Sequence, residues 1–320
     1  MAYTIAFFGT KPYDESSFTD KNKEFGFEIR YYKGHLNKNN VLLTQGVDAV
    51  CIFVNDIADA EVLRIMASNG VKLLALRCAG FNNVDLNAAA AAGITVVRVP
   101  AYSPYAVAEY TVALMLSLNR KIPRASWRTK DGNFSLHGLM GFDMHGKTAG
   151  IVGTGQIAKV LIRILKGFGL NILAYDLYPD REFAANEGVE YVPLEQLFRQ
   201  SDIISLHCPL TEQTRYMINE KAIDQMKEGM MLINTGRGQL IHTEALIEGL
   251  KKKKIGSAGL DVYEEEAAYF YEDTSDRIMG DDMLARLLSF NNVIVTSHQG
   301  FFTREALDNI AHTTLQNVRD

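Results

Sequence analysis

The chain has 320 residues, with 33 Lys and Arg against 38 Asp and Glu, a formal net charge of −5, and 47% apolar residues. This composition is typical of globular proteins and excludes a disordered or low-complexity chain. The acidic balance argues against a nucleic-acid binder, whose surface is normally basic. Because domains usually span about 100–200 residues, the length predicts two domains.

Neither membrane nor metal binding is expected. The N-terminal residues carry no basic leader and run directly into a predicted strand, which argues against a secretory signal. The most apolar stretch, 106–118, contains Glu109 and is shorter than the roughly 18 residues of a membrane span. Cys51, Cys78 and Cys208 are too few and too irregularly spaced for a disulfide framework or a metal site. We therefore expect a cytoplasmic protein without a metal.

The first hundred residues alternate short apolar segments with segments of helical period. Segments 59–68 and 85–92 have the helical period. The predicted strands, rich in Val, Ile and Phe, are 4–8, 27–31, 49–54, 73–76 and 95–99. This alternation predicts a parallel sheet covered by helices.

The pattern changes near Pro100, where we place a domain boundary. Ser103 and Pro104 are typical of a helix start, with Ser as the N-cap and Pro at the first position. Residues 106–118 then continue as a nearly all-apolar helix. Such a helix has to be buried on most sides, inside a domain or between subunits.

A second series of strands and helices follows. Segments 156–167 and 303–318 are predicted helices, and the predicted strands are 148–152, 171–175, 202–206, 230–233, 257–261 and 292–296. Four of these strands are almost wholly apolar, as a sheet buried on both faces requires; they contain Ile151, Ile204, Leu232 and Ile294.

A glycine-rich turn joins the strand 148–152 to the helix 156–167. Gly153 permits a tight turn, Gly155 lets a pyrophosphate approach the backbone, and the helix N-terminus presents free amides to it. Asp176 ends the next strand 21 residues after Gly155, close to the interval of about 20 in dinucleotide-binding units. Asp176 would bind the adenosine ribose and repel a 2′-phosphate, which predicts NAD rather than NADP. The alternative is an ordinary strand–turn–helix corner.

Arg237, Glu266 and His298 each follow a predicted strand, and the carboxyl ends of parallel strands share one edge of a sheet. An arginine can bind a substrate carboxylate through two parallel hydrogen bonds. A histidine can supply a proton near neutral pH, and a neighbouring carboxylate favours its charged form. The set therefore predicts hydride transfer between nicotinamide and a 2-oxo acid. Taken singly, each residue also has an ordinary structural explanation, as a cap, a solvated acid or a strand end.

Seven motifs spread over the whole chain resemble those of the NAD-dependent D-2-hydroxyacid dehydrogenases, and most closely the D-lactate dehydrogenases among them. They are RCAGFNNVD (77–85), VPAYSP (99–104), VGTGQIA (152–158), HCPLT (207–211), INTGRG (233–238), GLDVYE (259–264) and His298. Two departures are small: Ala158 stands where Gly is common, and Gly236 stands where Ala or Ser is commoner.

The resemblance implies an α/β fold with two Rossmann-like or flavodoxin-like domains, each with a parallel sheet. Residues 1–100 and 300–320 would form a discontinuous substrate domain, and residues 101–299 would form an inserted NAD-binding Rossmann domain. The long helix 104–118 would form the interface of a homodimer through the cofactor domain.

The resemblance also implies roles for individual residues. Arg237 would hold the substrate carboxylate, His298 would be the acid/base and Glu266 would tune it. Ala79, Gly80 and Tyr102 would complete the substrate site together with Arg237 and His298. The implied NAD contacts are Gly153, Thr154, Gly155, Gln156, Ile157, Asp176, His207, Cys208, Pro209, Thr214, Thr235, Gly236, Arg237 and Asp261.

The implied activity is a reversible, NADH-dependent reduction of pyruvate, or a related short 2-oxo acid, to the D-2-hydroxy acid, as in fermentation. A D-2-hydroxyisocaproate dehydrogenase or another sibling enzyme is an alternative. A different class, a non-catalytic NAD-sensing protein similar to the corepressors built on this fold, also remains open because a fold does not fix a function.

Overall fold

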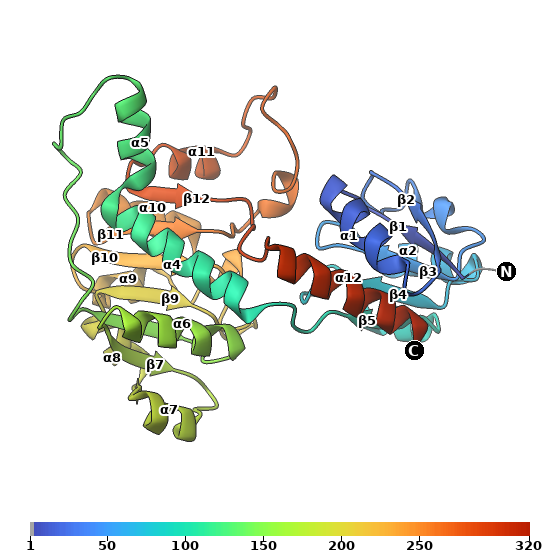
Figure 1. Cartoon of the computed structure of the whole chain (residues 1–320), viewed down its shortest axis with the longest axis horizontal. Coiled ribbons are helices and arrows are strands. Elements are labelled where there is room, and N and C mark those ends of the chain that lie inside the picture. The colour runs from blue at the N-terminus through green and yellow to red at the C-terminus, as the bar shows by residue number, and fades with distance from the viewer. Residues whose placement is uncertain (1–2) are drawn as a thin grey trace. The chain divides into compact units, whose positions relative to one another are not determined.

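The computed structural model describes residues 3–320, which form two compact units (Figure 1). One unit consists of the N-terminal residues through Ser103 together with Phe302–Asp320, and the other of Pro104–Phe301. Each unit contains one parallel sheet with helices. The prediction of two α/β domains with parallel sheets is therefore confirmed.

The first unit has a five-stranded sheet in the order β2-β1-β3-β4-β5, which is the flavodoxin-like order. The central strands β1 and β3 are buried along their whole length, which explains their continuous apolar sequences. The strands are β1 (Thr4–Phe7), β2 (Glu28–Tyr31), β3 (Ala49–Ile52), β4 (Leu73–Leu76) and β5 (Thr95–Arg98).

The helices of the first unit are α1 (Pro12–Asn22), α2 (Ala60–Ser68), α3 (Leu86–Ala91) and α12 (Arg304–Arg319), with a 3-10 turn at Val41–Thr44. The carboxylates of Asp59 and Asp85 cap α2 and α3, as expected for helix N-termini. The last helix, α12, lies along α1 and against β4 and β5 (Figure 1). The final residues of the chain thus belong to the unit that the first residues begin.

The second unit has a seven-stranded sheet in the order β12-β11-β10-β9-β6-β7-β8. Its strands are β6 (Thr148–Val152), β7 (Asn171–Tyr175), β8 (Glu190–Tyr191), β9 (Ile203–Leu206), β10 (Met230–Asn234), β11 (Ile255–Leu260) and β12 (Val293–Val295). The strand order reverses between β6 and β9, which is the switch point where such sheets bind ligands. The expectation of full burial around Ile294 was wrong, because β12 is an edge strand and only half-buried.

The helices of the second unit are α4 (Pro104–Arg120), α5 (Ile122–Lys130), α6 (Gln156–Gly167), α7 (Arg181–Glu187), α8 (Leu194–Gln200), α9 (Glu220–Gln225), α10 (Thr243–Lys251) and α11 (Asp282–Leu288). The apolar helix α4 packs against α6 and against β10 and β11 (Figure 1). It is buried on most sides, as predicted, and one exposed stripe carries Tyr105, Glu109 and Ala113.

Within residues 3–320, no helix combines the length and the apolar character needed to cross a membrane. The same residues contain no group of three or more His, Cys, Asp or Glu side chains arranged to hold a metal ion.

Candidate active site

The strand register of the second unit places predicted site residues in one row. Six strand-terminal residues are neighbours across the sheet, namely Tyr175, Val152, Leu206, Asn234, Leu260 and Val295. The residues that follow them are therefore side by side at the carboxyl edge: Asp176, Gly153, His207, Thr235, Asp261 and Thr296. All of these except Thr296 were predicted from the sequence as cofactor ligands.

The two glycines of the turn between β6 and α6 have different surroundings. Gly153 has a φ of 88°, and a Cβ atom there would lie 2.5 Å from the amide nitrogen of Cys208 in the neighbouring strand connection. Gly155 is the N-cap of α6, and a Cβ atom there would meet no protein atom within 4 Å. Packing therefore requires Gly153, whereas Gly155 faces open space at a helix N-terminus, where a dinucleotide pyrophosphate fits.

Asp176 is held against the glycine turn. Its Oδ2 accepts hydrogen bonds from the amide of Thr154 at 2.6 Å and from the Thr154 hydroxyl at 2.9 Å. Its Oδ1 accepts one from the amide of Tyr178 at 2.9 Å. Partial burial alone would raise the pKa of Asp176, but these hydrogen bonds outweigh it and lower the pKa below its ordinary value. The side chain is thus a carboxylate at neutral pH.

His207 and Cys208 follow β9 next to the turn. Burial lowers the pKa of His207 to about 4, and its Nε2 lies 2.8 Å from the hydroxyl of Ser205. Burial raises the pKa of the Cys208 thiol to about 11, and the thiol contacts the sulfur of Met217. Both groups are neutral at pH 7, so His207 is not a second proton donor at this edge. Thr214 folds back and donates its hydroxyl to the carbonyl of Pro209.

A buried amide shapes the turn that carries Arg237. Asn234 is fully buried; its Oδ1 accepts from the Gly236 amide at 3.0 Å and its Nδ2 donates to the Arg237 carbonyl at 2.9 Å. Arg237 is half-buried, and its Nη1 donates to the Gly236 carbonyl at 2.8 Å. Among residues 3–320 no carboxylate pairs with this guanidinium. The charge of Arg237 is thus available to a ligand.

The departure at Gly236 from the family motif has no structural cost. A Cβ atom at Gly236 would lie 3.4 Å from its nearest neighbour, the Leu206 carbonyl, which is ordinary contact. At Gly238, by contrast, a Cβ atom would overlap the backbone of Tyr263. Gly238 therefore lets the loops that follow β10 and β11 approach each other.

Glu266 and His298 form a pair, as predicted. Glu266 Oε1 lies 2.8 Å from His298 Nδ1, and the two side chains are 21% and 17% exposed. The second oxygen, Oε2, accepts a hydrogen bond from the amide of Tyr263 at 3.0 Å. With Nδ1 occupied by the carboxylate, the Nε2 atom of His298 is the ring position that can exchange a proton with a ligand.

The backbone of His298 is held in a left-handed conformation, with a φ of 53°. Its amide donates to the carbonyl of Asp261 at 2.7 Å, and its own carbonyl accepts from the hydroxyl of Tyr271 at 3.0 Å. A conformation of this kind costs free energy and persists only where the surroundings hold it. The positioning of His298 by Tyr271 and of Arg237 by Asn234 was not predicted, although Asn234 lies inside the INTGRG motif.

The carboxylate of Asp261 anchors the loop after β12. It accepts hydrogen bonds from the amides of Gln299 and Gly300 at 2.9 Å and 2.7 Å and from the hydroxyl of Thr296 at 2.6 Å. Burial raises the pKa of Asp261, although these hydrogen bonds and the nearby His298 act to lower it. Asp261 thus positions the His298 loop, a role that the resemblance did not imply.

The predicted substrate-binding residues of the first unit follow β4 and β5. The carbonyl of Ala79 accepts from Arg98 Nη1 at 2.8 Å, and that of Gly80 accepts from the Cys78 thiol at 3.3 Å. The amides of Ala79 and Gly80 make no hydrogen bond within residues 3–320 and can serve a ligand. The carbonyl of Tyr102 is fixed by Asn309 of α12 at 2.7 Å.

Arg77, the first residue of the RCAGFNNVD motif, is buried inside the first unit. It is only 2% exposed, its guanidinium lies 4.3 Å from the ring centre of Phe7, and its Nη2 donates to the Gly9 carbonyl at 2.9 Å. Asp14 lies 3.4 Å from the same nitrogen. Arg77 is therefore part of the framework of the RCAGFNNVD motif and does not reach a ligand.

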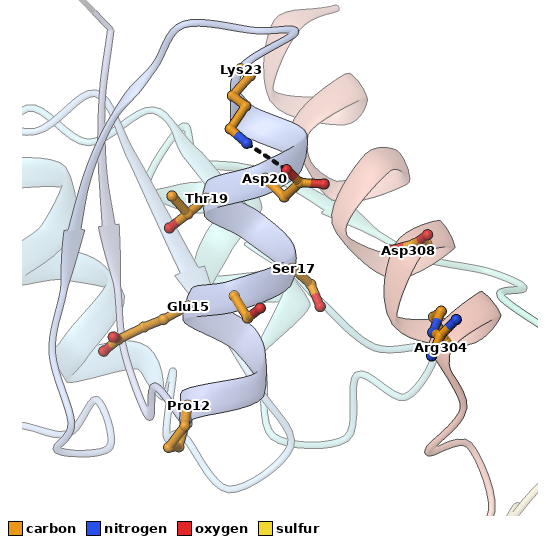
Figure 2. A pocket seen from close by; sticks show the side chains of 9 residues that line it. Pro12, Glu15, Ser17, Thr19, Asp20, Lys23, Arg304 and Asp308 are labelled. Carbon is orange, nitrogen blue, oxygen red and sulfur yellow. Dashed lines mark hydrogen bonds and ion pairs between the residues drawn. The ribbon is translucent and has the colours of Figure 1, made fainter.

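A separate groove runs between α1 and α12 (Figure 2). Figure 2 shows charged side chains of both signs along it, with the Lys23 ammonium 2.7 Å from the Asp20 carboxylate. The groove is open and contains none of the predicted site residues; its lining residues are Pro12, Glu15, Ser16, Ser17, Thr19, Asp20, Lys23, Arg304 and Asp308.

Comparisons with known proteins show which family this chain resembles. Residues 112–300 match the family model described as "D-isomer specific 2-hydroxyacid dehydrogenase, NAD binding domain". The chain is 52% identical to the D-lactate dehydrogenase of Escherichia coli K12 over 98% of this chain and 95% of that protein.

Two solved structures extend the comparison. The structure of the pyruvate reductase of Chlamydomonas reinhardtii is 44% identical, has a TM-score of 0.94, and is matched over 100% of this chain and 96% of that one. The structure of D-2-hydroxyisocaproate dehydrogenase is 33% identical, has a TM-score of 0.86, and is matched over 99% and 96%.

The doubly wound fold, the glycine turn and the acid after β7 define an NAD-dependent oxidoreductase. The similarity over nearly the full chain is more specific, and the chain belongs to the family of D-2-hydroxyacid dehydrogenases.

Proposed function

We propose that this enzyme reduces pyruvate, or a related short 2-oxo acid, to the D-2-hydroxy acid with NADH, in a reversible reaction of fermentative metabolism. The observation that carries the proposal is the Glu266–His298 pair, 2.8 Å apart, after strands of the same sheet edge as Arg237 and the glycine turn. The names of relatives, D-lactate dehydrogenase and pyruvate reductase, support the choice of substrate.

The residues at the switch point fit a dinucleotide. Gly155 leaves open space at the N-terminus of α6 for the pyrophosphate, and Asp176 offers a carboxylate to the adenosine ribose. Thr235 and Asp261 stand in the same row, toward the β12 side. When bound, NADH supplies the hydride that reduces the carbonyl carbon.

The protein then provides three functions. Arg237, whose guanidinium has no carboxylate partner among residues 3–320, would bind the substrate carboxylate in a two-point contact and orient the carbonyl. His298 would give a proton from Nε2 to the carbonyl oxygen as negative charge develops there. Glu266, on Nδ1, would fix the ring and stabilise its charged form. We also propose the amides of Ala79 and Gly80 and the side chain of Tyr102, all in the first unit, as substrate ligands.

We also propose a cytoplasmic homodimer formed through the cofactor domain. Apolar side chains are exposed around α4 and α5 and in the segment after them, as expected for an interface; they are Tyr105, Ile122, Trp127, Phe134, Leu136 and Met140. Cys51, Cys78 and Cys208 form no disulfide, which fits a reducing compartment. Sedimentation velocity of the purified protein would test the assembly.

The experiment that tests the activity follows NADH oxidation by absorbance with pyruvate, 2-oxobutyrate, 2-oxoisocaproate, glyoxylate and hydroxypyruvate, with chiral analysis of each product. The highest kcat/KM with pyruvate and a D product would support the proposal. A preference for 2-oxoisocaproate would keep the mechanism and favour the alternative suggested by the similarity to D-2-hydroxyisocaproate dehydrogenase. NADH binding without turnover of any of these acids would contradict the proposal and favour an NAD-sensing protein.

A further inference from the structure

A chain of hydrogen bonds links the edge strand β8 to Asp176. The hydroxyl of Tyr191, in β8, donates to the hydroxyl oxygen of Thr154 at 2.8 Å. The Thr154 hydroxyl in turn donates to Asp176 Oδ2 at 2.9 Å. At the other end of this series, the amide of Asp180 donates to the Tyr191 hydroxyl oxygen at 3.2 Å.

The two ends of this hydrogen-bond series, the Asp180 amide and the Asp176 carboxylate, determine the direction of every proton in it. A backbone amide can only donate, and an ionised carboxylate can only accept. The Tyr191 proton must therefore point to Thr154, and the Thr154 proton must point to Asp176. The hydroxyl groups have no second arrangement that keeps all the hydrogen bonds, so the network holds the side chains in one geometry.

The two carboxylate oxygens of Asp176 accept hydrogen bonds from different donors. Oδ2 accepts from both the amide and the hydroxyl of Thr154, which uses its two lone-pair directions. Oδ1 accepts from the Tyr178 amide and keeps room for a further donor. One oxygen is thus committed to the glycine turn, and the other is the acceptor that a ribose hydroxyl can reach.

Contacts outside this series of hydrogen bonds also hold the Tyr191 hydroxyl in place. Tyr191 is paired with Ala174 of β7, so its backbone moves with the strand that ends in front of Asp176. Asp180, whose amide binds Tyr191, is itself fixed by Lys159 at 2.5 Å and caps α7 through the Phe183 amide. Tyr191 therefore connects the edge strand β8 to the cofactor turn.

We propose that Tyr191 is a positioning residue that sets the preference for NAD over NADP, acting through Thr154 on the carboxylate of Asp176. The inference rests on the proposed role of Asp176 at the adenosine ribose. Without the Tyr191 hydroxyl, Thr154 loses its donor and the carboxylate gains freedom to rotate. Ribose binding then weakens, and the repulsion of a 2′-phosphate weakens with it.

The test compares Tyr191→Phe with Tyr31→Phe, both in the full-length protein. The control also removes a tyrosine hydroxyl that pairs with a threonine hydroxyl, Thr19 at 3.3 Å, but it lies in the first unit. Calorimetry with 5′-AMP and fluorescence titration with NADH and NADPH measure affinity without turnover. For Tyr191→Phe we expect AMP and NADH affinity to fall about fivefold, the effect of one lost hydrogen bond, and the NADH-to-NADPH preference to fall about tenfold. The control should match the parent.

A double-mutant cycle that combines Tyr191→Phe with Thr154→Val tests whether Tyr191 acts on Asp176 through Thr154. If Tyr191 acts through Thr154, the double variant should bind AMP no more weakly than Thr154→Val alone. Additive losses would overturn the route, and parent-like AMP and NADPH affinities in Tyr191→Phe would overturn the inference. Asp176→Asn separates this failure from that of the proposed function. If Asp176→Asn binds AMP weakly while Tyr191→Phe binds it like the parent, only the role of Tyr191 is refuted. If Asp176→Asn itself binds AMP like the parent, the role of Asp176 is refuted, and the inference about Tyr191 fails with it.

Discussion

Glu266 Oε1 lies 2.8 Å from Nδ1 of His298, although 32 residues separate the two in sequence. The pair depends on two strand ends, since Glu266 follows β11 and His298 follows β12. The amide of Tyr263 holds the second oxygen of Glu266, so the carboxylate cannot swing away without losing that hydrogen bond. The imidazole is thereby oriented with Nε2 as its free proton-exchanging position.

Replacing Glu266 by Gln should reduce kcat about 10–100-fold, because the neutral amide no longer stabilises the charged imidazole. NADH affinity should stay at the parent value, since Glu266 does not belong to the glycine turn. Stopped-flow reduction of pyruvate and NADH fluorescence titration measure the two effects. The exposed neighbour Glu265 offers the control Glu265→Gln. A kcat within twofold of the parent for Glu266→Gln would remove Glu266 from the mechanism.

Replacing Arg237 by Lys should raise the KM for pyruvate roughly 10–100-fold, because an ammonium group cannot reproduce the two parallel hydrogen bonds of a guanidinium. Steady-state kinetics with pyruvate at saturating NADH gives this value. The control is Arg215→Lys, which changes an exposed arginine stacked on Tyr216. An unchanged KM for pyruvate would show that the carboxylate is bound elsewhere.

The two glycines of the cofactor turn should respond differently to alanine. Gly153→Ala forces a Cβ atom against Cys208 at a φ of 88°, and we expect a loss of about 2–4 kcal/mol in the free energy of unfolding. Gly155→Ala meets open space in the protein and should leave stability within about 0.5 kcal/mol, while NADH affinity falls tenfold or more. Chemical denaturation and NADH titration of both variants test the contrast. Equal stability losses would contradict it.

His207 should make stability depend on pH. Its pKa is about 4 in the folded protein and near 6.5 in the unfolded chain, so the unfolded chain binds more protons between these values. The free energy of unfolding should therefore fall as the pH is lowered from about 6.5 toward 4, by at most about 1.4 kcal/mol per pH unit from this group. Below pH 4 this contribution changes no further.

Urea denaturation at intervals between pH 7 and 4 measures this slope. His207→Gln should flatten it, because glutamine cannot titrate. The exposed His137 provides the control His137→Gln, which should keep the slope of the parent. The same slope in His207→Gln and in the parent would mean that other groups cause the acid sensitivity.

The sequence predicts the strands well because buried parallel strands need continuous apolar runs, as in β6 and β9. It predicts the polar helix α1 poorly, since only Asp14 and Phe18 of that helix are buried and no apolar stripe marks it. The two-residue strand β8 is too short to show any period.

The glycine turn and His298 were within reach of sequence reasoning because motif residues carry them, and Glu266 was within reach because it follows the predicted strand 257–261. The contributions of Asn234, Tyr191 and Tyr271 were not, because each acts through a hydrogen bond whose partner is set by the folded backbone. The half-buried edge position of β12 likewise follows from strand order, which the apolar run around Ile294 does not reveal.

The return of α12 to the first unit has a consequence for biosynthesis. A ribosome completes the second unit, Pro104–Phe301, as one uninterrupted stretch, and this unit can fold while the chain is still being made. The first unit must wait, because α12, which packs on α1, β4 and β5, is synthesised only after the whole second unit. The first unit is therefore completed only after the whole second unit has been synthesised, and the apolar surface that α12 covers is exposed to chaperones during that interval.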